Sequence, residues 1–230
     1  MKIAVSGSYS TGKTTSTIAL SLLTGIEMIH ARTMREILPV VFPGKRLEEC
    51  NPGEIVELIF TRLQERIEEE TKHSGEYVSD GSFMQEWAYC APRVKYGMNP
   101  SERQIVALWK KHTAPAQWKT FRETMEVYGV MVRQRLNQYD LFIHLPIEFP
   151  LTADGHRPVN ERFRSMCDRL LRNTYMELAL PVYEVKGSIQ ERLESAIRYL
   201  QLSPKMDVRE AIVISKQIVK ERFNSIKLET

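Results

Sequence analysis

The segment that most restricts the fold of this chain runs from residue 7 to residue 14 and reads GSYSTGKT. It matches the pattern G-x-x-x-x-G-K-[ST] at every fixed position. An apolar run at residues 2–6 precedes it, and residues 13–23 continue as a predicted helix. A strand, a glycine-bounded turn and a helix in this order are typical of a phosphate-binding loop (P-loop) beside a parallel sheet, so the pattern predicts an α/β fold.

The chemistry of this loop follows from its residue types. Glycines let successive backbone N–H groups curl around phosphate oxygens, and the next helix adds free N–H groups and its positive dipole end. Lys13 is expected to reach the β- and γ-phosphates, and the Thr14 hydroxyl is expected to be a Mg²⁺ ligand. The alternative is an ordinary glycine-rich turn, which a complete match disfavours. The predicted cofactors are ATP and Mg²⁺, with the nucleotide held by Gly7, Ser8, Tyr9, Ser10, Thr11, Gly12, Lys13, Thr14 and Thr15.

Short apolar runs alternate with helical stretches along the rest of the chain, a pattern that indicates a mostly parallel sheet flanked by helices. Further strands are predicted at residues 25–30, 76–79, 140–145 and 182–185. Residues 54–71, most of 82–138 and nearly everything after 188 are predicted to be helical, with apolar residues and Arg62 on one face of the first of these helices. We therefore predict a P-loop NTPase three-layer fold with a five-stranded sheet.

Composition and length exclude several classes of protein. A chain of 230 residues suits one domain, or one domain with an appendage. No apolar run approaches the ~18 residues of a membrane span, and the start lacks the pattern of a secretory signal. Cys50, Cys90 and Cys167 are too widely spaced for a disulfide framework or a metal knuckle, which favours the cytoplasm. The net charge of +3 does not by itself predict a nucleic-acid partner, and self-association stays open.

Asp80 directly follows the predicted strand at residues 76–79. In open parallel sheets the ligand crevice lies at the carboxyl ends of the strands. A carboxylate there can hold magnesium or accept a proton from an acceptor hydroxyl, and the sequence leaves both roles open. An ordinary Asp-Gly turn is the alternative. We predict that Asp80 is both a catalytic and a metal-site residue.

Arginines gather after the strand at residues 140–145. Residues 154–158, which read DGHRP, lead into a predicted helix that carries Arg162, Arg164, Arg169 and Arg172. Phosphoryl transfer needs cations over the migrating group, and a helical lid can supply them. Acidic residues nearly balance the cluster, so most of it is predicted to be a solvated face. Arg157 and Arg164 are the two predicted catalytic residues of the lid.

Two short segments are candidates for binding the phosphoryl acceptor. One follows the second predicted strand, and the other lies one turn after Asp80, where an aromatic ring can stack on a base. Core packing is the commoner fate of the aromatic residues in the second segment. The predicted substrate-binding residues are His30, Arg32, Arg35, Glu86, Trp87 and Tyr89.

Residues 1–14 resemble the opening of the ribosylnicotinamide-kinase-like AAA-domain family, a P-loop group that includes the kinase domain of the bifunctional NAD-salvage regulator. Residues 80–82 with the Ala88-Tyr89 pair resemble the turn after the family's third strand, and residues 154–157 resemble its lid. The resemblance covers roughly residues 1–200 and implies a kinase. Gly81 replaces the family's arginine and Gln85 its second acidic residue, so the acceptor stays open.

The sequence as a whole predicts an ATP- and Mg²⁺-dependent kinase that moves the γ-phosphoryl group to a hydroxyl of a small nucleoside- or nucleotide-like acceptor. Residues 1–202 form the predicted P-loop kinase-like domain and residues 203–230 a helical C-terminal extension. One rival is a kinase acting on DNA or another polynucleotide, for which the charge-balanced tail gives poor support. The other is a nucleotide-gated ATPase or interaction protein, and no N-K-x-D guanine-reading motif supports it.

Overall fold

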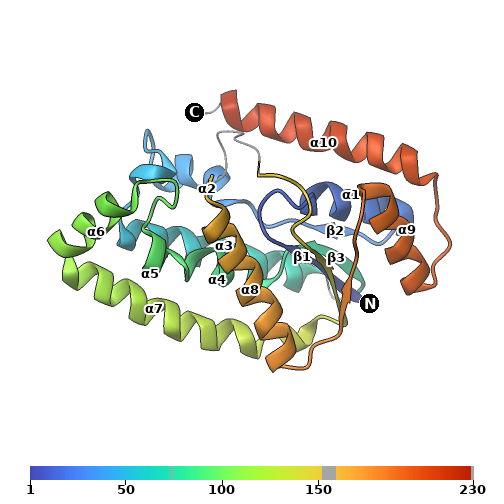
Figure 1. The fold of residues 1–230 in the computed structure, drawn as a ribbon. Helices are drawn as coiled ribbons and strands as arrows, with labels where there is room; N and C mark the ends of the chain where they lie inside the picture. Colours follow the sequence, from blue (N-terminus) through green and yellow to red (C-terminus); the bar gives the residue numbers. More distant parts are fainter. Residues whose placement is uncertain (74, 152–158, 229–230) are drawn as a thin grey trace.

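The computed structural model of the chain describes residues 1–73, 75–151 and 159–228, the last six of them by their backbone alone. Five parallel strands in the order β2-β3-β1-β4-β5 lie at its centre (Figure 1). This confirms the predicted α/β P-loop fold with a five-stranded parallel sheet. The strands are β1 (Lys2–Gly7), β2 (Met28–Ile29), β3 (Tyr77–Asp80), β4 (Leu141–Leu145) and β5 (Val182–Glu184).

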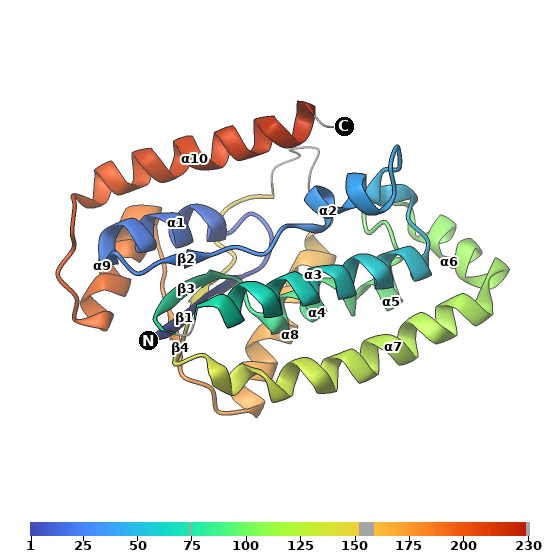
Figure 2. The ribbon, with the colours of Figure 1, turned by 180° about the vertical axis from the view of Figure 1, so that it is seen from behind.

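Helices cover both faces of the sheet (Figure 2). One face packs against α1, α9 and α10, and the other against α2, α3, α4, α7 and α8. Because β1 is covered on both sides, every residue after Lys2 in it is buried, which explains its continuous apolar run. The helices are α1 (Lys13–Thr24), α2 (Met34–Val41), α3 (Pro52–Lys72), α4 (Phe83–Cys90), α5 (Arg93–Tyr96), α6 (Gln104–Thr113), α7 (Pro115–Gln134), α8 (Glu161–Glu177), α9 (Ile189–Leu200) and α10 (Val208–Leu228), with short 3-10 turns η1 (Leu47–Glu49) and η2 (Leu136–Gln138).

Two predicted elements differ from those observed. The strand expected at residues 25–30 is shortened to β2, because Gly25 takes a left-handed conformation and caps the end of α1 by donating to the Ser21 carbonyl. Helix α2 was not predicted, since its Pro39 disfavours a helix interior. A capping box between Thr33 and Glu36 nevertheless starts this helix.

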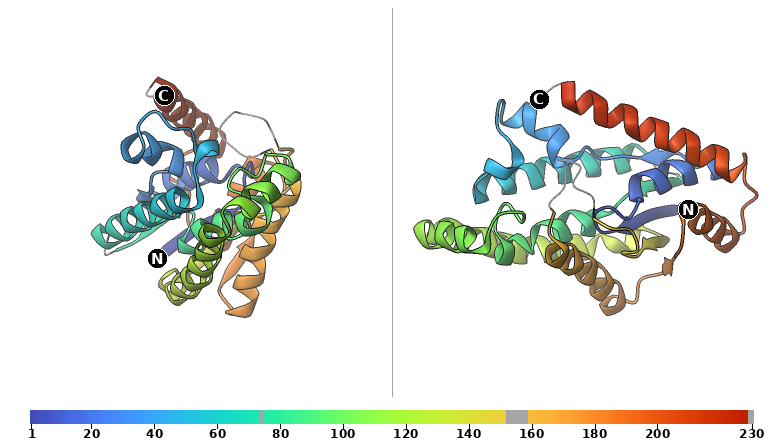
Figure 3. Two further views of the ribbon diagram at one scale, coloured as in Figure 1. Left: turned by 90° about the vertical axis from the view of Figure 1, so that its left-hand side faces the viewer. Right: turned by 45° about the horizontal axis from the view of Figure 1, so that its top comes forward.

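The end of the chain packs on the core. Figure 3 shows α10 running along α1, and the backbone N–H of Lys205 donates to the Leu23 carbonyl at 2.8 Å. Ala211 on α10 is fully buried in the same apolar cluster as Leu20 of α1. Further along α10, Val219 reaches the cavity beside the P-loop. The predicted boundary at residue 203 therefore falls between segments that share one core.

We expect Ala211→Glu to lower the free energy of unfolding by roughly 2–4 kcal/mol, because it overfills a packed site and buries a charge. Val213, two residues further along α10, is 68% exposed, so Val213→Glu is the matched control and should change stability by less than about 0.5 kcal/mol. Urea unfolding of both variants measures the difference. Equal effects would show that α10 does not dock on the core through Ala211.

Candidate functional site

The loop between β1 and α1 has the backbone shape that its glycines permit. A Cβ atom on Gly7 would lie 2.7 Å from the Leu145 carbonyl oxygen, so the close approach of β4 requires glycine. Gly12 has a φ of 83°, a left-handed conformation that glycine adopts at little cost. The Thr11 hydroxyl donates to the Ser8 carbonyl at 2.9 Å and closes the turn. These constraints shape residues 7–12 into a curled loop.

The start of α1 presents unused hydrogen-bond donors. Its N-cap is Gly12, which has no side chain to cap the helix, and no acidic residue lies in the first turn of this fully described element. The first N–H groups of a helix have no partner within the helix, and the dipole adds positive charge there. The start of α1 therefore suits a phosphate group.

Two buried arginines hold this loop from behind. Arg164 of α8 places Nη2 3.4 Å from the Ser10 carbonyl oxygen, and its own carbonyl accepts from the Ser8 hydroxyl at 3.0 Å. Arg192 of α9 donates to the Thr11 carbonyl at 2.6 Å and pairs with Glu148. Arg164 was predicted to be a catalytic residue of a lid, and the structure buries it against the backbone of the loop.

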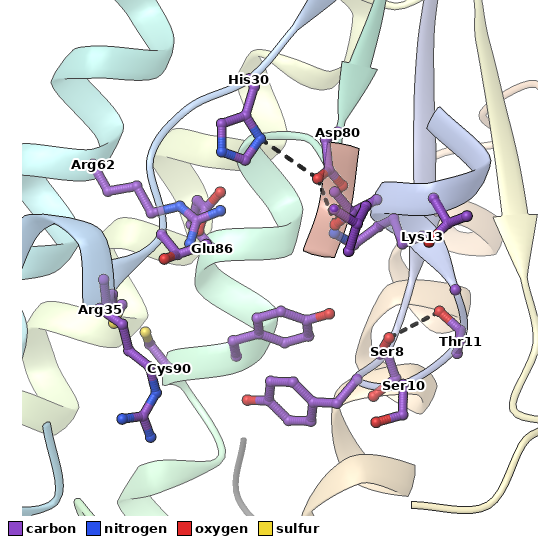
Figure 4. Close-up of a pocket in the computed structure, with 18 of the residues that line it drawn as sticks. Ser8, Ser10, Thr11, Lys13, His30, Arg35, Arg62, Asp80, Glu86 and Cys90 are labelled. Atoms are coloured by element: carbon purple, nitrogen blue, oxygen red, sulfur yellow. Dashed lines mark hydrogen bonds and ion pairs between the residues drawn. The ribbon is translucent and has the colours of Figure 1, made fainter. Parts of the chain in front are cut away.

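Asp80 joins the P-loop to β3. One carboxylate oxygen lies 2.6 Å from Lys13 Nζ, and the other accepts from the Thr14 hydroxyl at 2.8 Å (Figure 4). Asp80 is 4% exposed. Burial raises its pKa, but Lys13 and His30 outweigh burial and hold the pKa well below its usual value. Asp80 is therefore a carboxylate at neutral pH and gathers Lys13 and Thr14 at one point.

His30 lies between two carboxylates. Its Nδ1 is 3.6 Å from Asp80 Oδ2, and its Nε2 is 3.8 Å from Glu36 Oε2. Burial lowers the pKa of His30, yet Asp80 and Glu36 raise it more, so the net shift is upward. Burial raises the pKa of Glu36, but His30 and the Thr33 N–H bring it down to about 2. Glu36 thus connects the unpredicted helix α2 to the site.

Glu86 of α4 is locked between two arginines of α3. Its oxygens lie 2.6 Å from Arg62 Nε and 2.9 Å from Arg66 Nη2. Arg66 also donates to the Ser79 hydroxyl and to the Asp80 carbonyl. This network fixes the end of β3 against α3 and α4, and it leaves Arg62 and Glu86 on the cavity wall.

The two aromatic candidates after Asp80 lie in different places. Tyr89 lines the cavity, donates to the Gly7 carbonyl at 2.8 Å and stacks on Tyr9 with ring centroids 4.3 Å apart. Trp87 instead packs in the core, where its indole N–H donates to the Met125 carbonyl at 2.7 Å. Trp87 was predicted to bind substrate, and it is not among the residues that line the cavity.

Of the remaining predicted arginines, one lines the cavity, one does not, and one is not described. Arg35 of α2 lines the cavity and pairs with Glu48. Arg32 forms an ion pair with Glu65 at the surface and does not line the cavity, so its predicted contact with substrate is not supported. Arg157 lies outside the described residues.

A cavity of about 400 Å³ connects these groups (Figure 4). P-loop residues 8–15 form one wall, and α2, α3, α4, α5 and α10 form the others. Seven residues that line the cavity were not predicted from the sequence. Among these, only Arg62 could have been recognised, because it is a charged residue on the apolar face of a predicted helix. The unassigned lining residues are Thr33, Met34, Leu47, Arg62, Cys90, Arg93 and Val219.

Comparison with solved structures agrees with the fold of this chain. Three solved structures of deoxyadenosine kinase from M. mycoides share the fold. The one with the products dCMP and a flexible dCDP bound has a TM-score of 0.56 at 14% identity, covering 87% of this chain and 99% of that chain. The dATP-bound structure gives 0.52 at 14% identity (87% and 100% covered), and the dCTP-bound structure gives 0.51 at 13% identity (87% and 99% covered).

Sequence comparison places the chain in a family. No curated protein matches it significantly in sequence. No helix in the described parts of the chain is long and apolar enough to cross a membrane. Residues 2–192 match the family model described as an AAA domain, which carries the P-loop and implies nucleotide binding. The chain belongs to this AAA-domain family, with a P-loop fold like that of the deoxyadenosine kinase structures.

Proposed function

We propose that this protein is an ATP- and Mg²⁺-dependent kinase that transfers the γ-phosphoryl group to a hydroxyl of a small nucleoside- or nucleotide-like acceptor. The observation that carries this proposal is the meeting of Lys13, Thr14 and Asp80 at the edge of a cavity. In this proposal the P-loop binds the phosphates of the donor, ATP. The acceptor binds in the cavity beside the P-loop.

The residues present fit a magnesium–nucleotide complex. The Thr14 hydroxyl and the Asp80 carboxylate, 2.8 Å apart, are hard oxygen donors of the kind that Mg²⁺ prefers. Within the described residues no group of three or more His, Cys, Asp or Glu side chains is arranged to hold a metal ion by itself. Such a site suits Mg²⁺, which commonly takes one or two protein ligands and completes its shell with phosphate oxygens and water. When bound, the nucleotide supplies the phosphoryl group and the metal neutralises charge on its oxygens.

Of the two roles open for Asp80, the environment favours the metal site. A general base works best when its pKa lies near the working pH. The pKa of Asp80 is held well below its usual value by Lys13 and His30, so this carboxylate is a weak base. We infer that Asp80 orients Lys13, Thr14 and the metal.

The size and walls of the cavity support a small acceptor. A volume of about 400 Å³ is in the range of pockets for small molecules. Tyr9 and Tyr89 supply an aromatic surface beside the P-loop, suited to a planar ring. The solved structures that share the fold bind deoxynucleotides, and the resemblance to ribosylnicotinamide-like kinases also points to a nucleoside-like acceptor.

The identity of the acceptor is found by supplying Mg²⁺-ATP with labelled γ-phosphate to a panel of nucleosides, nucleotides and short oligonucleotides. We expect label in a nucleoside- or nucleotide-like product. Label found only in oligonucleotides would instead identify a polynucleotide kinase, and label released only as inorganic phosphate would identify an ATPase.

A role for Arg157 in transfer is tested by two arginine variants. We expect Arg157→Ala to lower kcat at least tenfold with little change in the Kd of ATP, because a cation that meets the migrating group acts mainly in the transition state. Arg172 is 39% exposed and pairs with Asp168 and Glu184 away from the cavity, so Arg172→Ala should change kcat little. Steady-state kinetics with nucleotide titration measure both. Equal, small effects of the two substitutions would show that Arg157 does not contribute to transfer.

A further inference from the structure

Arg93 is a buried cation on the wall of the proposed acceptor cavity. It begins the single-turn helix α5, lines the cavity and is only 5% exposed. It lies one helical turn beyond Cys90, close enough for its guanidinium to interact with the Cys90 thiol. Figure 4 shows Cys90 and Arg35 across the cavity from Lys13. Arg93 therefore lines the cavity beside Cys90.

The other buried arginines of the chain show what Arg93 lacks. Burying a guanidinium costs several kcal/mol unless a partner compensates it, so buried arginines are almost always paired. In the described parts of the chain, every other buried arginine has a carboxylate within ion-pair distance. These pairs are Arg62 and Arg66 with Glu86, Arg164 with Glu161, and Arg192 with Glu148.

Arg93 has no carboxylate partner among the described residues. Its Nη1 donates to the Met98 carbonyl, and its guanidinium lies 5.8 Å from the centre of the Phe163 ring. A carbonyl and an aromatic ring stabilise a cation only in part. The positive charge is thus left largely uncompensated.

The neighbouring ionisable side chains do not supply the missing charge. Burial raises the pKa of the Cys90 thiol to about 12, although Arg93 acts in the opposite direction. Burial likewise raises the pKa of Cys167 and of Tyr9, and Arg93 again opposes it. All three groups are neutral at physiological pH. Within the described residues no anionic side chain balances Arg93, so we infer that a bound ligand supplies the counter-ion.

We propose that the acceptor carries an anionic group, a phosphate or a carboxylate, that Arg93 binds on the cavity wall beside Cys90. This inference rests on the proposed kinase function and narrows its acceptor. The P-loop already provides for the phosphates of the donor, so the second anion belongs to the acceptor. An arginine suits it because the planar guanidinium binds two oxygens at once. Arg35, across from Lys13 and paired with Glu48, adds positive potential nearby.

The test is equilibrium binding by calorimetry to the full chain, with the P-loop saturated by a non-hydrolysable Mg²⁺-ATP analogue. Uridine is compared with orotidine, which adds a carboxylate, and adenosine and cytidine are compared with their 3′- and 5′-monophosphates. In the wild type we expect the anionic member of at least one pair to bind at least tenfold more tightly than the neutral one. Arg93→Gln should reduce that ratio to within twofold of one while leaving the neutral member's Kd unchanged.

Matched variants separate this role from a loss of charge or of packing. Arg122→Gln removes the same charge from an exposed position on α7 and should keep the wild-type ratio. Arg93→Lys keeps the cation and should retain most of the preference for the anionic ligand. This variant also provides a test if Arg93→Gln does not fold. Inorganic phosphate should compete with the preferred monophosphate in the wild type. Inorganic phosphate that binds as tightly as every monophosphate would show that the anion is not part of an acceptor.

Two results would overturn the proposal: no preference in any pair, or a preference that Arg93→Gln leaves intact. Because the measurement follows binding with the donor site filled, it is independent of turnover. Failure of the kinase function would appear separately, as absence of labelled product with every acceptor.

Discussion

Replacing Lys13 by alanine is expected to lower phosphoryl transfer by roughly 10²–10³-fold, the cost of losing one preorganised charge at the transferring group. The lysine is held at the start of α1 by its ion pair with Asp80, so its cation is already in place before the reaction. Transfer rates of the purified variant, with circular dichroism to establish folding, measure the effect.

The control for this variant is Lys72→Ala. Lys72 is exposed at the end of α3, pairs with Glu69 and does not line the cavity. Its loss should leave transfer within about twofold of wild type, since exposed pairs contribute little. A folded Lys13→Ala protein that transfers phosphoryl groups as fast as Lys72→Ala would remove the basis for the P-loop mechanism.

The second large effect is expected at Asp80. Asp80→Asn keeps the shape of the side chain but removes the charge that holds Lys13 and the metal, so turnover should fall by roughly 10²-fold or more. The affinity for Mg²⁺-ATP should fall with it, because Asp80 serves the nucleotide side of the site. Turnover is measured by ADP release and affinity by calorimetry with and without Mg²⁺.

Asp207→Asn is the matched control for that change. Asp207 caps α10 by accepting from the N–H groups of Arg209 and Glu210, and asparagine caps helices equally well. It should leave both kcat and the Kd of ATP unchanged. If Asp80→Asn lowers turnover while nucleotide affinity stays at the wild-type value, Asp80 acts on the acceptor hydroxyl, and the metal role inferred from its low pKa is wrong.

Most of the correct predictions depended on patterns of residues that are close together in the chain. The P-loop depends on a strand, fixed glycines and a helix that are adjacent in the chain, so GSYSTGKT was sufficient to locate it. Asp80 was found because buried parallel strands end at the same edge of the sheet. Residues 82–138, predicted to be mostly helical, contain α4, α5, α6 and α7.

Contacts between residues that are distant in the chain could not be predicted from the sequence, for physical reasons that differ from site to site. Helical spacing gave no direction for the arginines of α8, so Arg164 was predicted to be a catalytic residue of a lid, although it is buried against the backbone of the loop. Trp87 and Tyr89 are two residues apart on one short helix, and only tertiary packing decides which of them faces the cavity. Arg93 stands in a segment broken by proline and glycine, where a lone arginine carries no recognisable pattern.

The measurement that tests the central claim most directly is the ratio of phosphorylated acceptor to ADP formed from Mg²⁺-ATP. With the acceptor found in the labelled screen, a kinase should form one phosphorylated acceptor for each ADP, and the rate of ADP release should rise with acceptor concentration to a plateau. Lys13→Ala should lower the rate of acceptor phosphorylation by roughly 10²–10³-fold. ADP released at a slow rate that no acceptor increases, with inorganic phosphate as the sole phosphorylated product, would contradict the kinase assignment.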